Sequence, residues 1–230
     1  MKTFFFWEKM AAGKKVFAYI ICAAVFFSCN TVKKDGIYQR GRIVGYKVFS
    51  NGFDLDGIDS VTLEVAARNA WQNTLSGQTT IHWKYFDQGK QQFSEATGVK
   101  ENNKKVFLHP PRSGKFLFTE LSSFPFIYFP PKLGDVTSGT TIISTGFGEW
   151  DGSSIKTSDT LQARLLSNEG IAVGDSVWIT SGISEKTPLG RLQTKTAFHS
   201  KFGFVRVSYN FLDSNKSVEL VATSAEGFPE

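Results

Sequence analysis

The sequence predicts an all-β fold: an antiparallel β-sandwich, or a sandwich-like barrel, of roughly ten to twelve short strands. From Tyr38 onward, apolar and polar residues alternate with a period of two, as they do in strands that bury one face. Clusters of turn-forming residues separate these alternating runs. Helical patterns are weak, because the two candidate segments, 64–75 and 91–100, carry no convincing apolar stripe with helical spacing.

The clearest strand is Phe204–Phe211, in which apolar residues alternate with Arg206, Ser208 and Asn210. A polar loop and a second alternating run, Ser217–Thr223, follow it, and this arrangement predicts a β-hairpin. Two runs just upstream extend the hairpin into a meander. All the further strands are expected at residues 42–49, 60–66, 80–86, 104–108, 115–121, 140–144, 160–166, 176–180 and 189–198.

A proline-rich segment interrupts this alternation between residues 106 and 134. Aromatic residues lie between its prolines. Proline cannot donate a backbone hydrogen bond, so these positions must be sheet edges, strand ends or crossovers. We therefore expect Phe124–Pro131 to form a proline-bounded edge strand or an extended crossover. The segment holds five of the chain's seven prolines: Pro110, Pro111, Pro125, Pro130 and Pro131.

The beginning of the chain has the layout of a secretory signal. Lys14 and Lys15 precede an unbroken apolar run, Val16–Phe27, which the small residue Ser28 and then Cys29 follow. The run is expected to be helical. It is too short for a comfortable transmembrane helix, which needs about 20 residues to cross a hydrocarbon core of about 30 Å.

Residues 14–29 resemble the lipobox of bacterial lipoproteins, in which the cysteine becomes the acylated first residue. Phe26 and Phe27 stand where a leucine and a small residue are more usual. The resemblance implies that Cys29 is the lipid-attachment site and anchors the protein to a membrane of the cell envelope. Asn30 follows the cysteine in place of the aspartate that some bacteria use for inner-membrane retention, which favours the outer membrane.

The predicted organisation has three parts. A lipoprotein-type signal peptide comes first, a lipidated cysteine with a flexible polar tether follows, and a single β-rich globular domain forms the rest. Their bounds are 1–28, 29–37 and 38–230.

Composition narrows the classes of partner. The chain has a net charge of +5, but the leader holds four lysines against one glutamate, which leaves the mature part only +2. This charge is too small for a nucleic-acid footprint, so no nucleic-acid partner is expected. Cys22 lies in the predicted leader, and Cys29 would carry the lipid that the lipobox resemblance implies. The mature domain is therefore expected to hold no disulfide and no cysteine metal site.

No metal site is predicted. His82, His109 and His199 are scattered and show no metal-binding spacing. Asp54–Asp59 has the carboxylate spacing of a small calcium loop, but Val65 occupies the position where an EF-hand requires glutamate. A polar turn between two strands is the better interpretation of that segment.

No catalytic residue or cofactor is predicted either. Glu149 and Asp151 lie two residues apart in one extended segment, which does not provide two carboxyls across a cleft. The sequence lacks the Gly-x-Ser-x-Gly pattern, and the β-rich alternation lacks the strand, turn and helix that such a motif requires. We expect the protein not to be an enzyme.

Exposed aromatic residues are the remaining candidates for a binding site. A proline–aromatic strand can dock a partner protein, whereas tryptophans on loops with a polar neighbour can stack sugars. The first hypothesis is a non-enzymatic structural or interaction module that binds a protein of the envelope. A carbohydrate-binding module and an envelope hydrolase are the alternatives. The candidate binding residues are Phe126, Tyr128, Trp71, Trp150 and Arg112.

The aromatic residues of the chain also have a purely structural interpretation. The tryptophans of the strands, Trp83 and Trp178, would then be core or sheet-face residues. The proline segment would be a lid over one end of the sandwich.

Overall fold

The computed structural model of the chain describes residues 36–66, 77–143, 150–166 and 176–228. The leader, Cys29 and Trp71 lie outside these residues. The described part contains twelve strands and one 3-10 helix, η1 (Gly114–Leu121). The strands are β1 (Ile43–Asn51), β2 (Ser60–Val65), β3 (Thr79–Asp87), β4 (Lys90–Glu101), β5 (Lys105–Leu108), β6 (Phe126–Tyr128), β7 (Val136–Ile142), β8 (Ser154–Leu166), β9 (Ser176–Thr187), β10 (Gly190–His199), β11 (Gly203–Phe211) and β12 (Lys216–Glu226).

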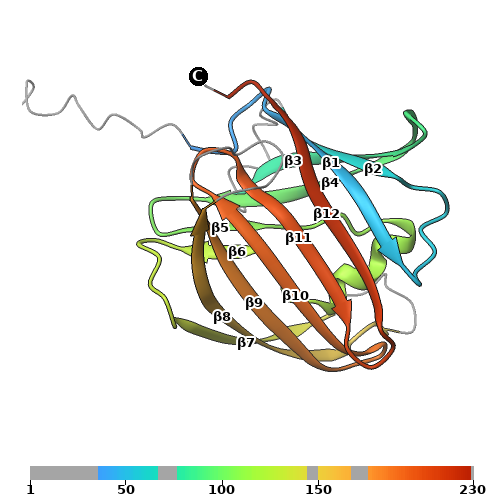
Figure 1. The fold of residues 1–230 in the computed structure, drawn as a ribbon, viewed down its shortest axis with the longest axis vertical. Coiled ribbons are helices and arrows are strands. Elements are labelled where there is room, and N and C mark those ends of the chain that lie inside the picture. The colour runs from blue at the N-terminus through green and yellow to red at the C-terminus, as the bar shows by residue number, and fades with distance from the viewer. Residues whose placement is uncertain (1–35, 67–76, 144–149, 167–175, 229–230) are drawn as a thin grey trace, which may run out of the picture. The chain divides into compact units, whose positions relative to one another are not determined.

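All twelve strands belong to one antiparallel sheet with the order β6-β5-β4-β3-β2-β1-β12-β11-β10-β9-β8-β7. Strands that follow each other in the chain pair with each other, except β6 and β7, and the first strand pairs with the last in the middle of the sheet (Figure 1). The sheet is not closed, because β6 and β7 do not pair with each other. Its two edges are therefore strands that follow each other in the chain.

The predicted all-β antiparallel fold is confirmed. The hairpin of β11 and β12 and the meander upstream of it are present as expected. Phe124–Pro131 does contain an edge strand, β6. One segment differs, because residues 115–121 were expected to form a strand and form η1 instead. The candidate helix at 91–100 is part of β4, and the one at 64–75 begins in β2 and continues outside the described residues.

Local turn chemistry explains how neighbouring strands meet. Between β3 and β4, Gln88 and Gly89 both adopt positive φ angles, 47° and 79°, and form a two-residue hairpin loop. This geometry matches the right-handed twist of the strands on either side. Between β1 and β2, the Asp54 carboxylate accepts a hydrogen bond from the Asp56 backbone at 2.9 Å. Asp54–Asp59 is thus a polar turn, as the sequence indicated.

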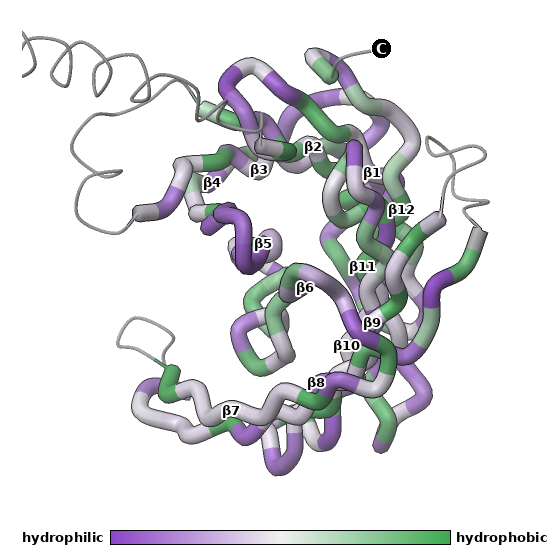
Figure 2. The backbone as a smooth tube through the Cα atoms, turned by 90° about the vertical axis from the view of Figure 1, so that its left-hand side faces the viewer, coloured by the Kyte–Doolittle hydropathy of each residue, from purple (hydrophilic) through white to green (hydrophobic). Residues whose placement is uncertain are grey.

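The sheet curls around its own interior, as Figure 2 shows, so that β3 and β4 lie across from β7 and β8. The η1 helix packs on the inner face, where Phe116, Phe118 and Leu121 are all buried. The Phe118 ring lies 5.3 Å from the ring of Tyr209 on β11, measured between centroids. The Phe116 ring lies 5.4 Å from that of Tyr85 on β3. The helix therefore joins two separate parts of the sheet into one core.

A partly buried carboxylate fixes the segment that leads into η1. Glu95 on β4 accepts hydrogen bonds from the backbone N–H groups of Arg112 and Ser113, at 2.6 and 3.1 Å. The Ser113 hydroxyl donates to it at 2.8 Å, and the Tyr85 hydroxyl is a further donor. Because several hydrogen bonds converge on this charged group, the Glu95 carboxylate holds the start of η1 against the sheet.

No helix in the described ranges is both long enough and apolar enough to cross a membrane.

Candidate functional site: a cleft between the two sheet edges

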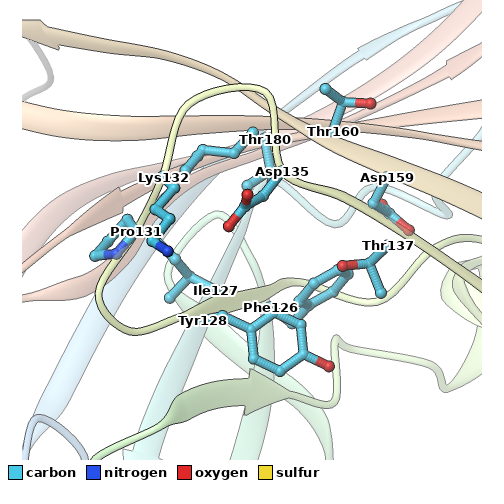
Figure 3. Close-up of a pocket in the computed structure, with 11 residues that line it drawn as sticks. Phe126, Ile127, Tyr128, Pro131, Lys132, Asp135, Thr137, Asp159, Thr160 and Thr180 are labelled. Carbon is cyan, nitrogen blue, oxygen red and sulfur yellow. The ribbon is translucent and has the colours of Figure 1, made fainter.

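A cleft lies between the edge strand β6 and the inner side of β7, β8 and β9. One wall is β6, the other comes from β7, β8 and β9, and the connection between β6 and β7 borders it. Figure 3 shows the aromatic rings of β6 on one side and Asp159 with Thr137 on the other. The edge cleft, as we call it, is small, with a cavity volume of about 30 Å³, and it is partly open to solvent. It is lined by Phe126, Ile127, Tyr128, Pro131, Lys132, Asp135, Thr137, Asp159, Thr160, Leu161 and Thr180.

The wall formed by β6 is short but firmly held. Phe126 and Tyr128 pair with Phe107 and Lys105 of β5. The ladder continues beyond both ends of β6. The Pro125 carbonyl accepts a hydrogen bond from the Leu108 backbone N–H at 2.9 Å, and the Phe129 backbone N–H donates to the Lys104 carbonyl at 2.8 Å. The rings of Phe126 and Tyr128 meet edge to face, with centroids 5.5 Å apart. Tyr128 is 46% exposed, so it presents an aromatic ring at the mouth of the cleft.

The connection between β6 and β7, which borders the cleft, carries a further exposed apolar side chain. The Gly134 backbone donates to the Leu161 carbonyl at 2.9 Å, and the Leu161 backbone donates to the Asp135 carbonyl at 3.0 Å. These bonds fix the connection against β8. Leu133 stands out from it and is 61% exposed. A large apolar side chain at this exposure is a common feature of protein interaction sites when it lies beside others.

The inner end of the cleft is polar. Asp159 on β8 is buried, and one of its oxygens accepts a hydrogen bond from the Ser123 hydroxyl. Burial raises the pKa of Asp159 above its ordinary value, and the bond from Ser123 opposes this shift in part. Thr180 lies beside it, with its hydroxyl 2.5 Å from that of Thr196 on β10. The cleft therefore combines an apolar mouth with hydrogen-bonding groups at depth.

Asp159 fits at this depth only because its neighbour on β9 is a glycine. A Cβ atom built on Gly182 would lie 1.8 Å from Asp159 Oδ1 and 2.9 Å from the Ser123 Cβ. Both distances are far below ordinary contact. Asp159 and Gly182 are paired across β8 and β9, so the space above the glycine is where the carboxyl sits.

The titratable group at the inner end of the cleft is Asp159. Its hydrogen-bond partner is the Ser123 hydroxyl, and none of the chain's three histidines is among the residues that line the cleft. That the protein is not an enzyme stays a prediction.

The structure brings together two of the five predicted binding residues. Phe126 and Tyr128 both line the edge cleft. Arg112 lies elsewhere, with its Nη1 atom 3.1 Å from Glu120 Oε1 in an ion pair beneath η1. Trp150 is half-buried and packs against the hydrophobic core. Trp71 lies outside the described residues.

Sequence reasoning did not identify Leu133, Asp135 or Asp159. A signal for Asp159 was present, because Ile155, Thr157 and Asp159 alternate with exposed residues along β8. The predicted strand began at residue 160, so the carboxyl was not placed on an inward face. No local sequence pattern singles out Leu133, because its position beside the cleft depends on how the connection between β6 and β7 folds.

The histidines do not assemble into a metal site. Burial and the nearby Arg112 charge lower the pKa of His109 to about 4. Its ring packs against those of Phe107 and Phe124. Among the described residues, no three histidine, cysteine, aspartate or glutamate side chains lie together in a way that could hold a metal ion.

A second, shallower depression crosses β7 to β10 on the opposite face of the sheet from Asp159. Most of its lining residues carry hydroxyl or amide groups, and none of them is aromatic, so it offers no ring on which a sugar could stack. Lys156 and Glu185 give it one charge of each sign. Its lining residues are Ser138, Gly139, Thr140, Lys156, Thr157, Ser158, Thr160, Gln162, Ser181, Ile183, Glu185 and Gln193.

Comparison with known proteins gives the fold a precedent. No protein-family model and no curated protein matches the sequence. Two solved structures are similar to this chain. An inferred lipoprotein of Parabacteroides distasonis has a TM-score of 0.45 and 10% identity, over 83% of this chain and 97% of that chain. An inferred exported protein of Bacteroides fragilis with a YmcC-like fold has a TM-score of 0.51 and 9% identity, over 83% of this chain and 98% of that chain. The second likeness shows that this chain shares the fold of the Bacteroides protein.

Proposed function

We propose that this protein is an exported, lipid-anchored component of the bacterial cell envelope that binds a partner protein through the edge cleft. The leader and the lipobox-like segment ending at Cys29 support export and anchoring. The Bacteroides fragilis protein of the same fold is itself inferred to be exported, and the proposal extends this to the present chain. The proposal also places the anchor in the outer membrane, because Asn30 and not aspartate follows Cys29.

The observation that supports the binding role is the exposure of Tyr128, which lines the edge cleft, and of Leu133, which lies on the connection between the lining residues Lys132 and Asp135. Burying one such side chain against a partner contributes about 1.5–3 kcal/mol. Leaving both in water forgoes this gain, and apolar side chains that cluster at a cleft are typical of interaction sites. The fitting occupant is an apolar side chain of a partner protein, with a polar group that reaches Asp159.

Lipid attachment is tested by growing cells on a labelled fatty acid and isolating the full-length chain. The parent protein should incorporate the label, and the Cys29→Ala variant should not, because the thiol is the proposed attachment atom. Cys22 provides the matched control, since Cys22→Ala should remain labelled. An unlabelled parent protein, or equal labelling of the Cys29→Ala variant, would contradict the anchoring.

Partner binding is tested by crosslinking in native membranes followed by affinity purification. Tyr128→Ser and Leu133→Ser should each reduce recovery of the partner about tenfold, the effect of losing roughly 1.4 kcal/mol of binding free energy. Phe49→Ser is the matched control, because Phe49 is 47% exposed on β1 and does not line the cleft. A partner that all three variants recover equally would not be bound at this site.

The carbohydrate-binding alternative stays a prediction. It relied on exposed tryptophans near polar groups. Of these, Trp150 is half-buried in the core and Trp71 lies outside the described residues.

A further inference from the structure

The strand β7 has one side on which no strand lies within the described chain. At the two ends of its pairing with β8, Asp135 accepts from the Leu161 backbone and Ile143 donates to the Ser153 carbonyl. Hydrogen-bonded residues alternate along an antiparallel pair. The odd-numbered residues from 135 to 143 therefore bond β8, and the even-numbered residues direct their N–H and C=O groups away from it. These residues are Val136, Ser138, Thr140 and Ile142.

The sequence of this strand is self-complementary. Val-Thr-Ser-Gly-Thr-Thr-Ile has Gly139 at its centre, so an antiparallel copy would place Val136 opposite Ile142 at both ends. These two side chains are 62% and 70% exposed, among the most exposed large apolar residues described. Between them, hydroxyl residues would face hydroxyl residues. Cross-strand pairs of both kinds stabilise a sheet.

The edge also lacks the usual features that prevent strands from pairing. Natural edge strands carry lysine, proline, a bulge or an inward-pointing charge that blocks a second chain. β7 has no charged residue and no proline, and its register with β8 runs without a shift from Val136 to Ile142. An approaching copy of the same strand would therefore meet no like charge on it.

Gly139 would occupy the centre of such a pair. Because it is an odd-numbered residue, it would meet its copy as a non-hydrogen-bonded pair, in which the two Cα atoms approach to about 4.5 Å. Glycine suits this close approach. The hydrogen-bonded pairs on either side would be Ser138 with Thr140 and Val136 with Ile142, each formed twice. Together they would contribute about eight backbone hydrogen bonds.

We propose that two copies of this protein associate through β7, antiparallel to each other around a twofold axis at Gly139. A symmetric pairing of this kind uses the same patch on both copies and closes as a dimer. The proposal goes beyond the partner binding described above, because the pairing uses the outer edge of β7. The edge cleft lies on the inner side, where Thr137 and Asp159 line it.

The test is disulfide crosslinking of the full-length chain in native membranes. A cysteine at position 139 would face its own copy across the axis, where non-hydrogen-bonded neighbours are close enough for a disulfide. A Cβ atom at this position meets only the Thr157 hydroxyl at 3.6 Å, so the Gly139→Cys variant fits without strain. Two controls are needed. The parent chain tests for crosslinks through Cys22 or Cys29, and Gln162→Cys places an exposed thiol on β8 away from the edge.

Thr140→Pro, added to Gly139→Cys, removes an N–H that points to the second copy and none that bonds β8. We expect a disulfide-linked dimer with Gly139→Cys alone, no dimer in either control, and about a tenfold loss of dimer in the double variant. Absence of the Gly139→Cys dimer, or equal dimer with Gln162→Cys, would overturn the proposal. If partner recovery still depends on Tyr128 in that case, the self-association fails and the proposed function stands.

Discussion

Gly182 and Asp159 share a space beside the edge cleft that holds only one side chain. Gly182→Ala would push a methyl group into the Asp159 carboxyl and the Ser123 Cβ, neither of which is a flexible chain end. We expect a loss of about 1–3 kcal/mol in the free energy of unfolding, as for other overpacked sites. Urea denaturation measures it.

Gly139→Ala provides the matched control for this change, since its added Cβ makes one ordinary contact at 3.6 Å. Its effect should stay within about 0.5 kcal/mol. Equal losses in the two variants would mean that the space beside Asp159 is not as tight as described.

The charge of Asp159 should make the stability depend on pH. Burial raises its pKa above the ordinary value of 3.8, so the folded protein holds this proton to a higher pH than the unfolded chain does. Between the unfolded and the folded pKa the folded state binds more protons, and stability falls as the pH rises through this window. The contribution is therefore complete below the unfolded pKa and lost above the folded one.

The Asp159→Asn variant cannot ionise and should lack this loss. Its free energy of unfolding, relative to that of the parent, should rise between about pH 3.5 and pH 7. Denaturation of both proteins at the two pH values measures the difference. A difference that stays constant, or that falls with pH, would contradict a raised pKa in the folded protein.

Among the elements, η1 is the one whose removal should cost most. Phe118 is buried, and its ring contacts those of Phe53, Tyr209 and Phe211. Phe118→Ala should lower the free energy of unfolding by about 3–5 kcal/mol. Phe49→Ala removes the same ring from an exposed position and should cost less than about 1 kcal/mol. A small loss with Phe118→Ala would show that η1 is not part of the core.

The same element shows where the sequence misleads. Residues 115–121 alternate in a way that predicts a strand, but they form a 3-10 helix whose residues from Phe118 to Leu121 are all buried. Because these four consecutive residues have no solvent face, their hydrophobic period carries no information on the type of element. The edge strand β6 was easier to predict from the sequence, because the prolines on either side of it limit what the segment can form.

At the scale of the whole molecule, alternation predicted most of the strands and their class but not the order in which they pair. Most pairs are neighbours in sequence, and turn residues such as Gln88 and Gly89 indicate them. The pairing of β1 with β12 joins residues far apart in the chain, for example Val48 with Leu220. Because a period of two assigns faces and not partners, the sequence could not show that β6 and β7 become the edges.

The position of the cleft follows from that order. Phe126 and Tyr128 could be selected from the sequence as aromatic residues in a proline-bounded strand. Asp159 and Thr180 belong to other strands, β8 and β9. Only the curl of the sheet brings these strands close to Phe126 and Tyr128. The sequence could therefore predict one wall of the candidate site, the one that β6 forms, but not the opposite wall.

The most direct test of the binding role is photocrosslinking in intact cells. A photoreactive amino acid at position 128 should form a crosslink to one distinct envelope protein, since this side chain stands at the mouth of the edge cleft. The same group at position 49 should not, although that side chain is equally exposed. A specific product at 128 alone would support the edge cleft as the partner site. Identical products at both positions, or none at 128, would contradict it.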